Sequence, residues 1–321
     1  MCTVEPTVLA RTFGLVEVHA DSLSPWACVH RARTADGRDV VVKRTAPSAR
    51  RAEAMARWTR ALVHEGVPVV TPVELALANP AQVQDDWCVV YPFLTGRAYA
   101  AQDLGDVRAA GSLLGRIHAT PLDTSVLQAL RPYAWPGTTR AEVETDLATL
   151  GTRLPAMLGP RAGEHALGAV TALADRWWQE SFPMLRSADT TLPRAGVSSD
   201  FKAANLIYAP PVLVDPDNGG LEPRLFDLAM AVVLFHHESP SAPGRLFTET
   251  EWQAFYAGYA EHVTLTPAER DLWPAALDHM FWEEGTWVLE DNDDDAWADP
   301  RQGAYLRDLA TINPARFSLP H

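Results

Sequence analysis

The chain has 321 residues, which is enough for one large domain or for two smaller units with separate cores. Its hydrophobic content of 47% is typical of a globular protein, and no apolar run is long enough to indicate a transmembrane helix. A formal net charge of -14 argues against a nucleic-acid partner, because a phosphate backbone would be repelled. The acidity is compatible with a cationic substrate and equally compatible with a role in solubility alone.

The N-terminus and the cysteines bear on where the protein works. Residues 1–5 lack the basic region and the apolar run of a secretory signal peptide. The three cysteines, Cys2, Cys28 and Cys88, are odd in number, scattered and without metal-site spacing. This usage favours a reducing compartment over a disulfide framework. We therefore expect a cytoplasmic protein with no membrane partner, and the sequence does not indicate its oligomeric state.

The first part of the chain, residues 11–45, has the pattern of β-strands. The strands are expected at residues 16–18, 26–32 and 39–43. The pair Asp36-Gly37 predicts a tight hairpin turn before the third strand. That strand ends at Lys43, which is one of only two lysines in the chain. The loop between the first two strands contains Ser22 and Ser24 but no glycine.

A helix and further strands follow. Ser48 is expected to cap a helix that runs to about Glu65 and stops at Gly66. Glu53 lies beside the apolar stripe of this helix. More strands are expected at residues 72–77 and 87–92. The segment 91–96 then has no helical period, and such a connector can offer backbone groups and aromatic side chains to an adenine ring.

From residue 103 onward helical patterns dominate. Helices are expected at residues 103–120, 140–150, 164–178, 250–262 and 267–289, with others opening at Phe226 and near Ala304. Pro155 and Pro160 are expected to interrupt the helical stretch around them. His118 is expected to be a packed or capping residue. Asp227 is expected to be a helix cap or a support for the loop before it.

The strongest motif lies in residues 197–215. Asp200, Lys202 and Asn205 follow one another at short spacing, and a strand, a turn and a second strand then lead to Asp215. Phosphoryl transfer from ATP needs one carboxylate to orient the attacking hydroxyl, and an amide oxygen and a second carboxylate to hold magnesium. The combination is much more specific than an Asp and an Asn at this spacing alone.

These residues, with Phe226-Asp227 and Ala229 after them, resemble the phosphotransfer site of the aminoglycoside phosphotransferase and choline kinase group, which is similar in fold to the protein kinases. The resemblance implies an α+β, two-lobed fold. Residues 1–93 would form a nucleotide-binding lobe with a small antiparallel sheet and one main helix. Residues 94–321 would form a larger, mostly helical lobe for catalysis and substrate binding. The group usually has His-Gly where this chain has Ser198-Ser199, and we expect this change to alter loop support rather than abolish chemistry.

The resemblance also implies ATP and Mg²⁺ as cofactors and assigns roles around the motif. Asp200 would accept a hydrogen bond from the substrate hydroxyl. Lys202 would neutralise charge on the transferring phosphate. Asn205 and Asp215 would bind magnesium, and Asp217 is a second carboxylate that could reach the metal.

Nucleotide contacts are implied for the first lobe. Lys43 would reach the α- and β-phosphates and would be held by a helix glutamate, for which Glu53 is the candidate. The loop between the first two strands would cover the phosphates. The residues expected at the nucleotide, besides these two, are Ser22, Ser24, Tyr91, Phe93 and Leu94.

The acceptor is expected to be a small molecule. Only about eleven residues separate Asp215 from Asp227, which leaves no long platform for a peptide. Antibiotic kinases of this resemblance bind polyamine-like sugars through acidic C-terminal residues, which points to Glu283 and Glu284 and, less, to the acidic run 290–295. A solvated acidic surface is the alternative for each of these residues.

Three functions remain in competition. The leading one is an ATP- and Mg²⁺-dependent kinase for a hydroxyl of an aminoglycoside-like or other cationic antibiotic, that is, a resistance enzyme. A second is a metabolic kinase for choline, a sugar or an amino alcohol. A non-catalytic, nucleotide-binding pseudokinase is the third, because of Ser198-Ser199 and the glycine-free loop. The set Lys43, Asp200, Asn205 and Asp215 counts against this last possibility.

Overall fold

The computed structural model describes residues 5–24 and 27–320. The chain divides into two compact units. Unit 1 comprises Met1–Arg97, Thr120–Pro132 and Ile207–Leu221, and unit 2 comprises Ala98–Ala119, Tyr133–Leu206 and Glu222–His321. Unit 1 thus takes in two later segments that a single boundary after residue 93 does not anticipate. The fold is α+β, and the two units are described separately.

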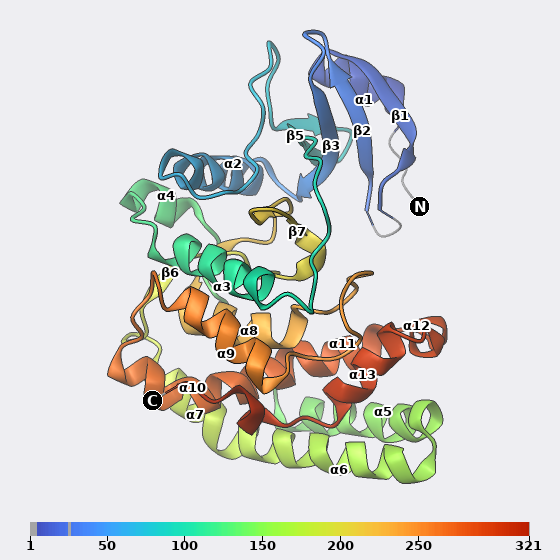
Figure 1. Cartoon of the computed structure of the whole chain (residues 1–321), viewed down its shortest axis with the longest axis vertical. Helices are drawn as coiled ribbons and strands as arrows, with labels where there is room; N and C mark the ends of the chain where they lie inside the picture. The colour runs from blue at the N-terminus through green and yellow to red at the C-terminus, as the bar shows by residue number, and fades with distance from the viewer. Residues whose placement is uncertain (1–4, 25–26, 321) are drawn as a thin grey trace. The chain divides into compact units, whose positions relative to one another are not determined.

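Unit 1 is built on a five-stranded antiparallel sheet (Figure 1). Its strands are β1 (Leu15–Ser22), β2 (Val29–Thr34), β3 (Asp39–Ala46), β4 (Ala81–Val83) and β5 (Asp86–Pro92), in the order β1-β2-β3-β5-β4. Alternation puts Val40 and Val42 of β3 in the core, which is the period-2 burial expected of a strand. Gly37 has φ 85°, so the expected hairpin turn forms with glycine in the left-handed region.

The N-terminal helix was missed in the sequence. Residues from 11 onward were expected to be extended, but α1 (Pro6–Phe13) is helical up to Phe13. Proline near its start and Gly14 at its C-cap, with φ 66°, are ordinary helix boundary signals. Leu9 and Phe13 pack into the sheet core, and this burial stabilises a helix of only two turns.

The strand expected at residues 72–77 is also wrong, because β4 at Ala81–Val83 pairs with β5 instead. Asn79 explains the difference. Its side-chain amide donates to the carbonyls of Val73 (2.9 Å) and Val90 (2.8 Å), and its carbonyl accepts from the Val90 N–H (2.9 Å). An asparagine side chain therefore bonds the β5 backbone where a neighbouring strand would otherwise do so.

The main helix of unit 1 is α2 (Ala49–His64), as expected from its capping residues. The hydroxyl of Ser48 accepts from the Arg51 N–H at 3.4 Å, and Gly66 follows the helix with φ 75°. Unit 1 also contains the short α4 (Thr124–Ala129), which lies against α2 (Figure 1). The hairpin of β7 (Leu206–Ile207) and β8 (Val212–Leu213) forms where the motif predicted it.

Unit 2 is mostly helical. Its α-helices are α3 (Leu104–Ala119), α5 (Arg140–Leu158), α6 (Pro160–Arg176), α7 (Phe182–Ala188), α8 (Arg224–Leu234), α9 (Glu249–Tyr259), α10 (Pro267–Met280), α11 (Thr286–Asp291), α12 (Asp294–Ala298) and α13 (Gln302–Ala310). Helices α3 and α9 lie side by side (Figure 1) because glycines let their backbones approach. A Cβ added at Gly111 would lie 1.9 Å from the Phe255 carbonyl oxygen, and one at Gly258 would lie 2.0 Å from that of Arg108.

Proline and π-helical turns change the expected helix boundaries. Pro155 lies inside α5, so the expected interruption there is wrong, whereas Pro160 does begin a new helix. A π-helical turn, Phe281–Gly285, divides the helix expected over residues 267–289 into α10 and α11. A second π turn, Trp177–Ser181, follows α6. Such turns carry one extra residue, redirect the following side chains and are frequent at functional sites.

The cysteines differ in part from the expectation of reduced thiols. Cys88 is a buried free thiol, Cys28 is disulfide-bonded, and Cys2 lies outside the described residues. The disulfide at Cys28 contradicts the expectation for that residue. None of the helices described in residues 5–24 and 27–320 is long and apolar enough to span a lipid bilayer.

Candidate functional site

Lys43 lies at the centre of a charged cluster in unit 1. It is on β3, the middle strand of the sheet, and its side chain is 9% exposed. Its Nζ is 2.5 Å from Asp215 Oδ1 and 2.9 Å from Asp217 Oδ2. Both carboxylates follow strand β8, so the hairpin of the motif delivers them to the sheet. The structure thus brings the predicted nucleotide lysine and the predicted metal carboxylates together.

Asp217 is the more deeply buried of the two acids, with 8% of its side chain exposed against 41% for Asp215. Its Oδ1 accepts hydrogen bonds from the hydroxyls of Thr45 (2.7 Å) and Tyr91 (2.8 Å). Arg51 donates to its main-chain oxygen at 3.3 Å. The carboxylate of Asp217 is therefore occupied by two hydroxyls and the lysine, whereas Asp215 keeps exposed surface for a ligand.

These contacts determine the protonation states of Lys43 and Tyr91. Burial alone would lower the pKa of Lys43, but the charges of Asp217 and Asp215 outweigh it and raise that pKa above its ordinary value. Burial and the charge of Asp217 also raise the pKa of Tyr91, so its hydroxyl stays a donor. The ammonium of Lys43 is therefore fully charged at neutral pH, as a phosphate-binding group must be.

The prediction that Glu53 holds Lys43 was wrong. Glu53 is exposed on α2, and it shares its stripe with the equally exposed Arg57 and Arg60. These three positions lie four and three residues apart, so they form one face of the helix, which is the face away from the core. Asp217 takes the place expected for the helix glutamate. Two hydroxyls donate to Asp217 Oδ1, and Oδ2 has the Lys43 ion pair but no hydrogen-bond partner, so the metal role of Asp217 stays a prediction.

In the loop expected to cover the phosphates, the hydroxyl of Ser22 forms its hydrogen bonds with the backbone of the same loop. The hydroxyl of Ser22 accepts from the N–H groups of Ser24 (3.2 Å) and Val29 (3.2 Å) and faces the Ala27 carbonyl at 2.7 Å. Ser22 thus acts within the loop, and its hydroxyl is not directed at a ligand. Pro25 of this loop and Trp26, the expected start of the second strand, lie outside the described residues.

The three residues expected beside adenine differ in exposure. Tyr91 is 1% exposed and its hydroxyl is used by Asp217, so its ring is not available for the expected adenine contact. Phe93 is half-buried, with the Arg31 guanidinium 4.5 Å from its ring centroid. Leu94 is also half-buried and packs against the cluster around Tyr91. Phe93 and Leu94 therefore remain the candidates.

Asp200, Lys202 and Asn205 form a second cluster, which lies within unit 2. The Asn205 amide donates to the Asp200 main-chain oxygen (2.9 Å) and to its Oδ2 (3.1 Å). Lys202 Nζ is 3.3 Å from Asp200 Oδ1. Because the NH₂ group of Asn205 faces Asp200, its amide oxygen is left as a possible metal ligand. The local spacing in the sequence predicted that these three residues lie together, which they do, and their roles stay a prediction.

The loop before Asp200 is held by Asp227. Its two carboxylate oxygens accept from the N–H groups of Ser198 (3.1 Å) and Ser199 (2.9 Å). His118 Nε2 lies 2.9 Å from the same carboxylate, and its Nδ1 lies 3.0 Å from the Tyr259 hydroxyl. The expectation that Asp227 supports this loop is confirmed. Ser199 adopts φ 52°, the left-handed region that favours glycine, so serine here keeps the backbone course at some steric cost.

One residue of this cluster was not found in the sequence. Glu238 follows α8, and its Oε2 is 3.1 Å from Lys202 Nζ. Burial would lower the pKa of Lys202, but the charges of Asp200 and Glu238 raise it. Glu238 lies outside the motif, in a stretch without periodicity. Its backbone is left-handed (φ 56°), but the sequence gives no indication of this conformation.

Glu283 and Glu284 lie on the π turn that follows α10. Burial, with the charges of Glu284 and Asp146, raises the pKa of Glu283 to about 7. Burial and the charge of Asp200 raise the pKa of Glu284, which places this carboxylate within electrostatic range of the motif aspartate. The acidic run has another use, because Asp293 caps α12 by accepting from the Ala296 N–H at 2.9 Å.

The part of the chain that the structure describes has no group of three or more His, Cys, Asp or Glu side chains able to hold a metal by themselves. Magnesium does not need such a cage, because it keeps several waters and takes one or two protein oxygens besides substrate phosphates. The half-exposed carboxylate of Asp215 in unit 1 and the amide oxygen of Asn205 in unit 2 are each an oxygen donor of the kind that magnesium prefers.

Comparison with known proteins agrees with this geometry. The sequence profile described as the Phosphotransferase enzyme family matches residues 29–273. Stress response kinase A of Shigella flexneri is 28% identical over 174 residues, which are 53% of this chain and 48% of the relative. The chain therefore spans about half the length of the curated relatives it matches.

Solved structures share the fold. The microcompartment-associated aminopropanol kinase superposes with a TM-score of 0.62 at 16% identity and covers 97% of this chain and 96% of its own. The amicoumacin kinase in complex with AMP-PNP, Ca²⁺ and Ami superposes with a TM-score of 0.59 at 18% identity and covers 95% of this chain and 92% of its own. With a profile match over most of its length, this chain belongs to the phosphotransferase enzyme family.

Proposed function

We propose that this enzyme transfers the γ-phosphoryl group of ATP to a hydroxyl of a small cationic molecule, with Mg²⁺ as the metal. The observation that carries the proposal is the cluster of Asp200, Lys202 and Asn205 on a loop held by Asp227. Asp200 would orient the hydroxyl, and Lys202 would neutralise charge on the transferring phosphate.

The nucleotide end rests on unit 1. Lys43 has a raised pKa, lies between two carboxylates and would bind phosphate oxygens. Asp215 and Asn205 are the proposed oxygen ligands of the metal. Magnesium, when bound, neutralises the phosphates during transfer. The amicoumacin kinase holds AMP-PNP and Ca²⁺, and this supports a nucleotide with a divalent cation for the present chain.

The acceptor class rests on Glu283 and Glu284. A protonated amine beside these half-buried carboxylates would gain charge-assisted hydrogen bonds. An antibiotic acceptor would make the chain a resistance enzyme, and the amicoumacin kinase is one solved relative in fold whose acceptor is bound with it. The aminopropanol kinase supports an amino alcohol as the alternative acceptor. A cytoplasmic location stays part of the proposal, although the disulfide at Cys28 counts against it.

A turnover assay tests the function. We expect ADP to form from ATP and Mg²⁺ when the right member of a panel is added, the panel being an aminoglycoside, spectinomycin, choline and 1-amino-2-propanol. The Asp200→Asn variant should bind nucleotide normally and lose this turnover. Nucleotide binding without turnover on any acceptor would favour the pseudokinase reading. Equal turnover by wild type and Asp200→Asn would contradict the proposal.

A further inference from the structure

The carboxylate of Glu238 has a position that the motif does not account for. Lys202 Nζ lies between two acids, 3.3 Å from Asp200 Oδ1 and 3.1 Å from Glu238 Oε2. The side chains of Lys202 and Asp200 are 16% and 17% exposed and that of Glu238 is 36% exposed, so the ammonium and the motif carboxylate are the more shielded members of this three-charge group. Where water is partly excluded, each charge interacts more strongly with neighbouring charges than it would at a fully exposed site.

The backbone of Glu238 is held in an unfavourable conformation. Its φ of 56° is in the left-handed region, which costs a non-glycine residue about 1–3 kcal/mol. Glycine or asparagine would meet that conformation at lower cost. A glutamate there therefore costs some stability, and among the described residues its side chain forms ion pairs with Lys202 and with the adjacent His237.

The segment that carries Glu238 is anchored on both sides. The Glu238 N–H donates to Gln302 Oε1 at 3.3 Å. Its neighbour His236 accepts from the Tyr99 hydroxyl (3.2 Å) at Nε2 and donates from Nδ1 to the Arg245 carbonyl (2.7 Å). Burial lowers the pKa of His236 to about 4, so this imidazole is neutral and its two bonds are fixed.

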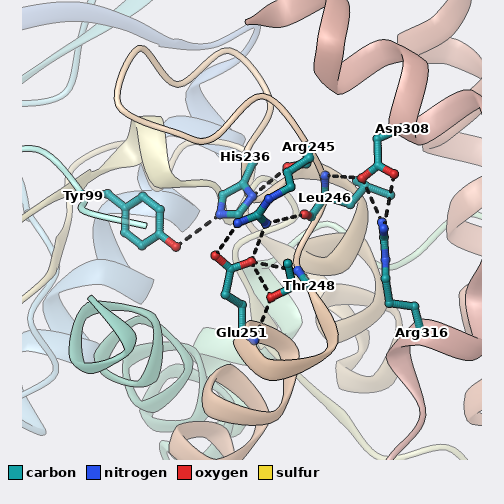
Figure 2. A network of polar contacts seen from close by, with 8 residues as sticks. All are labelled: Tyr99, His236, Arg245, Leu246, Thr248, Glu251, Asp308 and Arg316. Carbon is teal, nitrogen blue, oxygen red and sulfur yellow. Dashed lines mark hydrogen bonds and ion pairs between the residues drawn. The ribbon is translucent and has the colours of Figure 1, made fainter. Parts of the chain in front are cut away.

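Figure 2 shows how this anchor continues beyond His236. Arg245 binds Glu251 through NH2 and Oε1 at 2.8 Å, and Glu251 also accepts from the Thr248 N–H at 2.7 Å. The next residue, Leu246, donates its N–H to Asp308 at 2.9 Å, and Asp308 is paired with Arg316. Arg245 and Leu246, which follow Glu238 in the chain, are thus tied to α9 and to the end of α13.

We propose that Glu238 is a positioning residue for phosphoryl transfer, acting through Lys202. Its charge draws the ammonium away from a full pairing with Asp200. The group Asp200–Lys202–Glu238 then has a net charge of about -1 instead of zero, which preserves the acceptor strength of Asp200 for the substrate hydroxyl. Lys202 has three N–H donors and two carboxylate partners among the described residues, so one donor is left for a phosphoryl oxygen.

This inference rests on the proposed function, so its test includes Asp200→Asn as a reference. The assay uses ATP, Mg²⁺ and the panel acceptor that wild type turns over fastest, or water as acceptor if none is used. The Glu238→Gln variant should lower kcat about tenfold and leave KM for ATP within about twofold. The exposed Glu164 of α6 offers a matched control, and Glu164→Gln should equal wild type.

A double-mutant cycle separates positioning through Lys202 from a direct role. If Glu238 acts only through Lys202, the variant Lys202→Met with Glu238→Gln should be no slower than Lys202→Met alone. If the two substitutions lower kcat by factors that multiply in the double variant, the inference is overturned in favour of direct acceptor contact. A raised acceptor KM with unchanged kcat in Glu238→Gln would have the same meaning. Wild-type kinetics in Glu238→Gln would overturn it outright. Unchanged turnover in Asp200→Asn would instead remove the proposed function itself.

Two further measurements guard against trivial loss of structure. The Glu238→Gly variant should unfold at no lower temperature than wild type, because glycine adopts this φ freely, while its kcat falls as in Glu238→Gln. The side-chain signal of Lys202, titrated by NMR, should show a lower pKa in Glu238→Gln, with Asp200 and His237 as the remaining charged or titratable neighbours. An unchanged titration would show that the ion pair is absent in solution and would overturn the inference.

Discussion

The two lysines of this chain have similar surroundings and different constraints. Each lies between two carboxylates, one of which is less exposed than the other. The buried partner of Lys43 is Asp217, whose other contacts are hydroxyls, so its work is to hold the lysine. The less exposed partner of Lys202 is Asp200, which is proposed to orient the substrate hydroxyl. Lys43 is therefore held by an acid with a structural role, whereas Lys202 pairs with the acid that is proposed to contact the substrate hydroxyl.

The largest effect should come from breaking the second group at Asp200. Asp200→Asn keeps the shape and the hydrogen bond from Asn205 but removes the charge that orients the hydroxyl. We expect kcat to fall on the order of 10³-fold, since general-base groups contribute roughly 10²–10⁴-fold. Calorimetric titration with AMP-PNP should give an unchanged Kd. A decrease of less than about threefold in kcat would show that another group accepts the proton.

Breaking the first group should affect stability as well as activity. Lys43→Met leaves Asp217 buried without its cation, which should lower the free energy of unfolding by about 3 kcal/mol. Turnover should fall about 100-fold because the phosphates lose a charged donor. Urea unfolding and steady-state kinetics measure the two effects.

The control for that loss is a second substitution. Lys43→Met with Asp217→Asn removes the unpaired charge and should recover most of the stability while turnover stays low. Equal stability of the single and double variants would mean that the buried pair is not what holds this region together.

A smaller effect distinguishes the two candidate partners of Lys43. Asp217→Asn should raise KM for ATP about tenfold, because the lysine loses its fixed counter-ion but keeps Asp215. The matched variant Glu53→Gln should stay within about twofold of wild type, since Glu53 is exposed. The reverse order of effects would restore the helix glutamate as the partner and contradict the structure.

The surroundings of the two lysines also show what the sequence could predict and what it could not. Asp200, Lys202 and Asn205 were found because their chemistry depends on spacing within one loop, which the sequence displays directly. The partner of Lys43 was missed because Asp217 reaches it only through the fold. Glu53 was predicted as this partner because it lies on the helix that follows Lys43. Successive side chains on a helix point about 100° apart, so a difference of one position decides whether a side chain faces the sheet or the solvent.

The same reasoning applies to the fold. The α+β class, helix α2 with its Ser48 cap and the β7–β8 hairpin followed from periodicity and capping residues. Helix α1 was missed because two turns give too short a pattern. The expected strand at residues 72–77 was wrong because the side chain of Asn79 replaces a neighbouring strand. Glu238 could not be found, because no motif marks it and its ion pair with Lys202 joins residues that lie far apart in the sequence.

The smallest predicted effect concerns pH and the acceptor. Glu283 has a pKa of about 7 in the free protein, so it is mostly neutral at pH 6 and mostly ionised at pH 8. A permanently charged acceptor such as choline should therefore bind several-fold more tightly at the higher pH, because only the ionised carboxylate attracts it. Measuring KM across this range checks the sign. In Glu283→Gln the dependence should flatten, and an unchanged slope would assign it to another group.

The most direct test of the central claim uses the fact that the chain has only two lysines. Labelling their side chains gives two NMR signals, which Lys43→Arg and Lys202→Arg assign. Titration with Mg²⁺ and AMP-PNP should shift the Lys43 signal saturably, with a Kd equal to that from calorimetry. Nucleotide binding that leaves the Lys43 signal unmoved would contradict the account, because Lys43 would then lie outside the phosphate site.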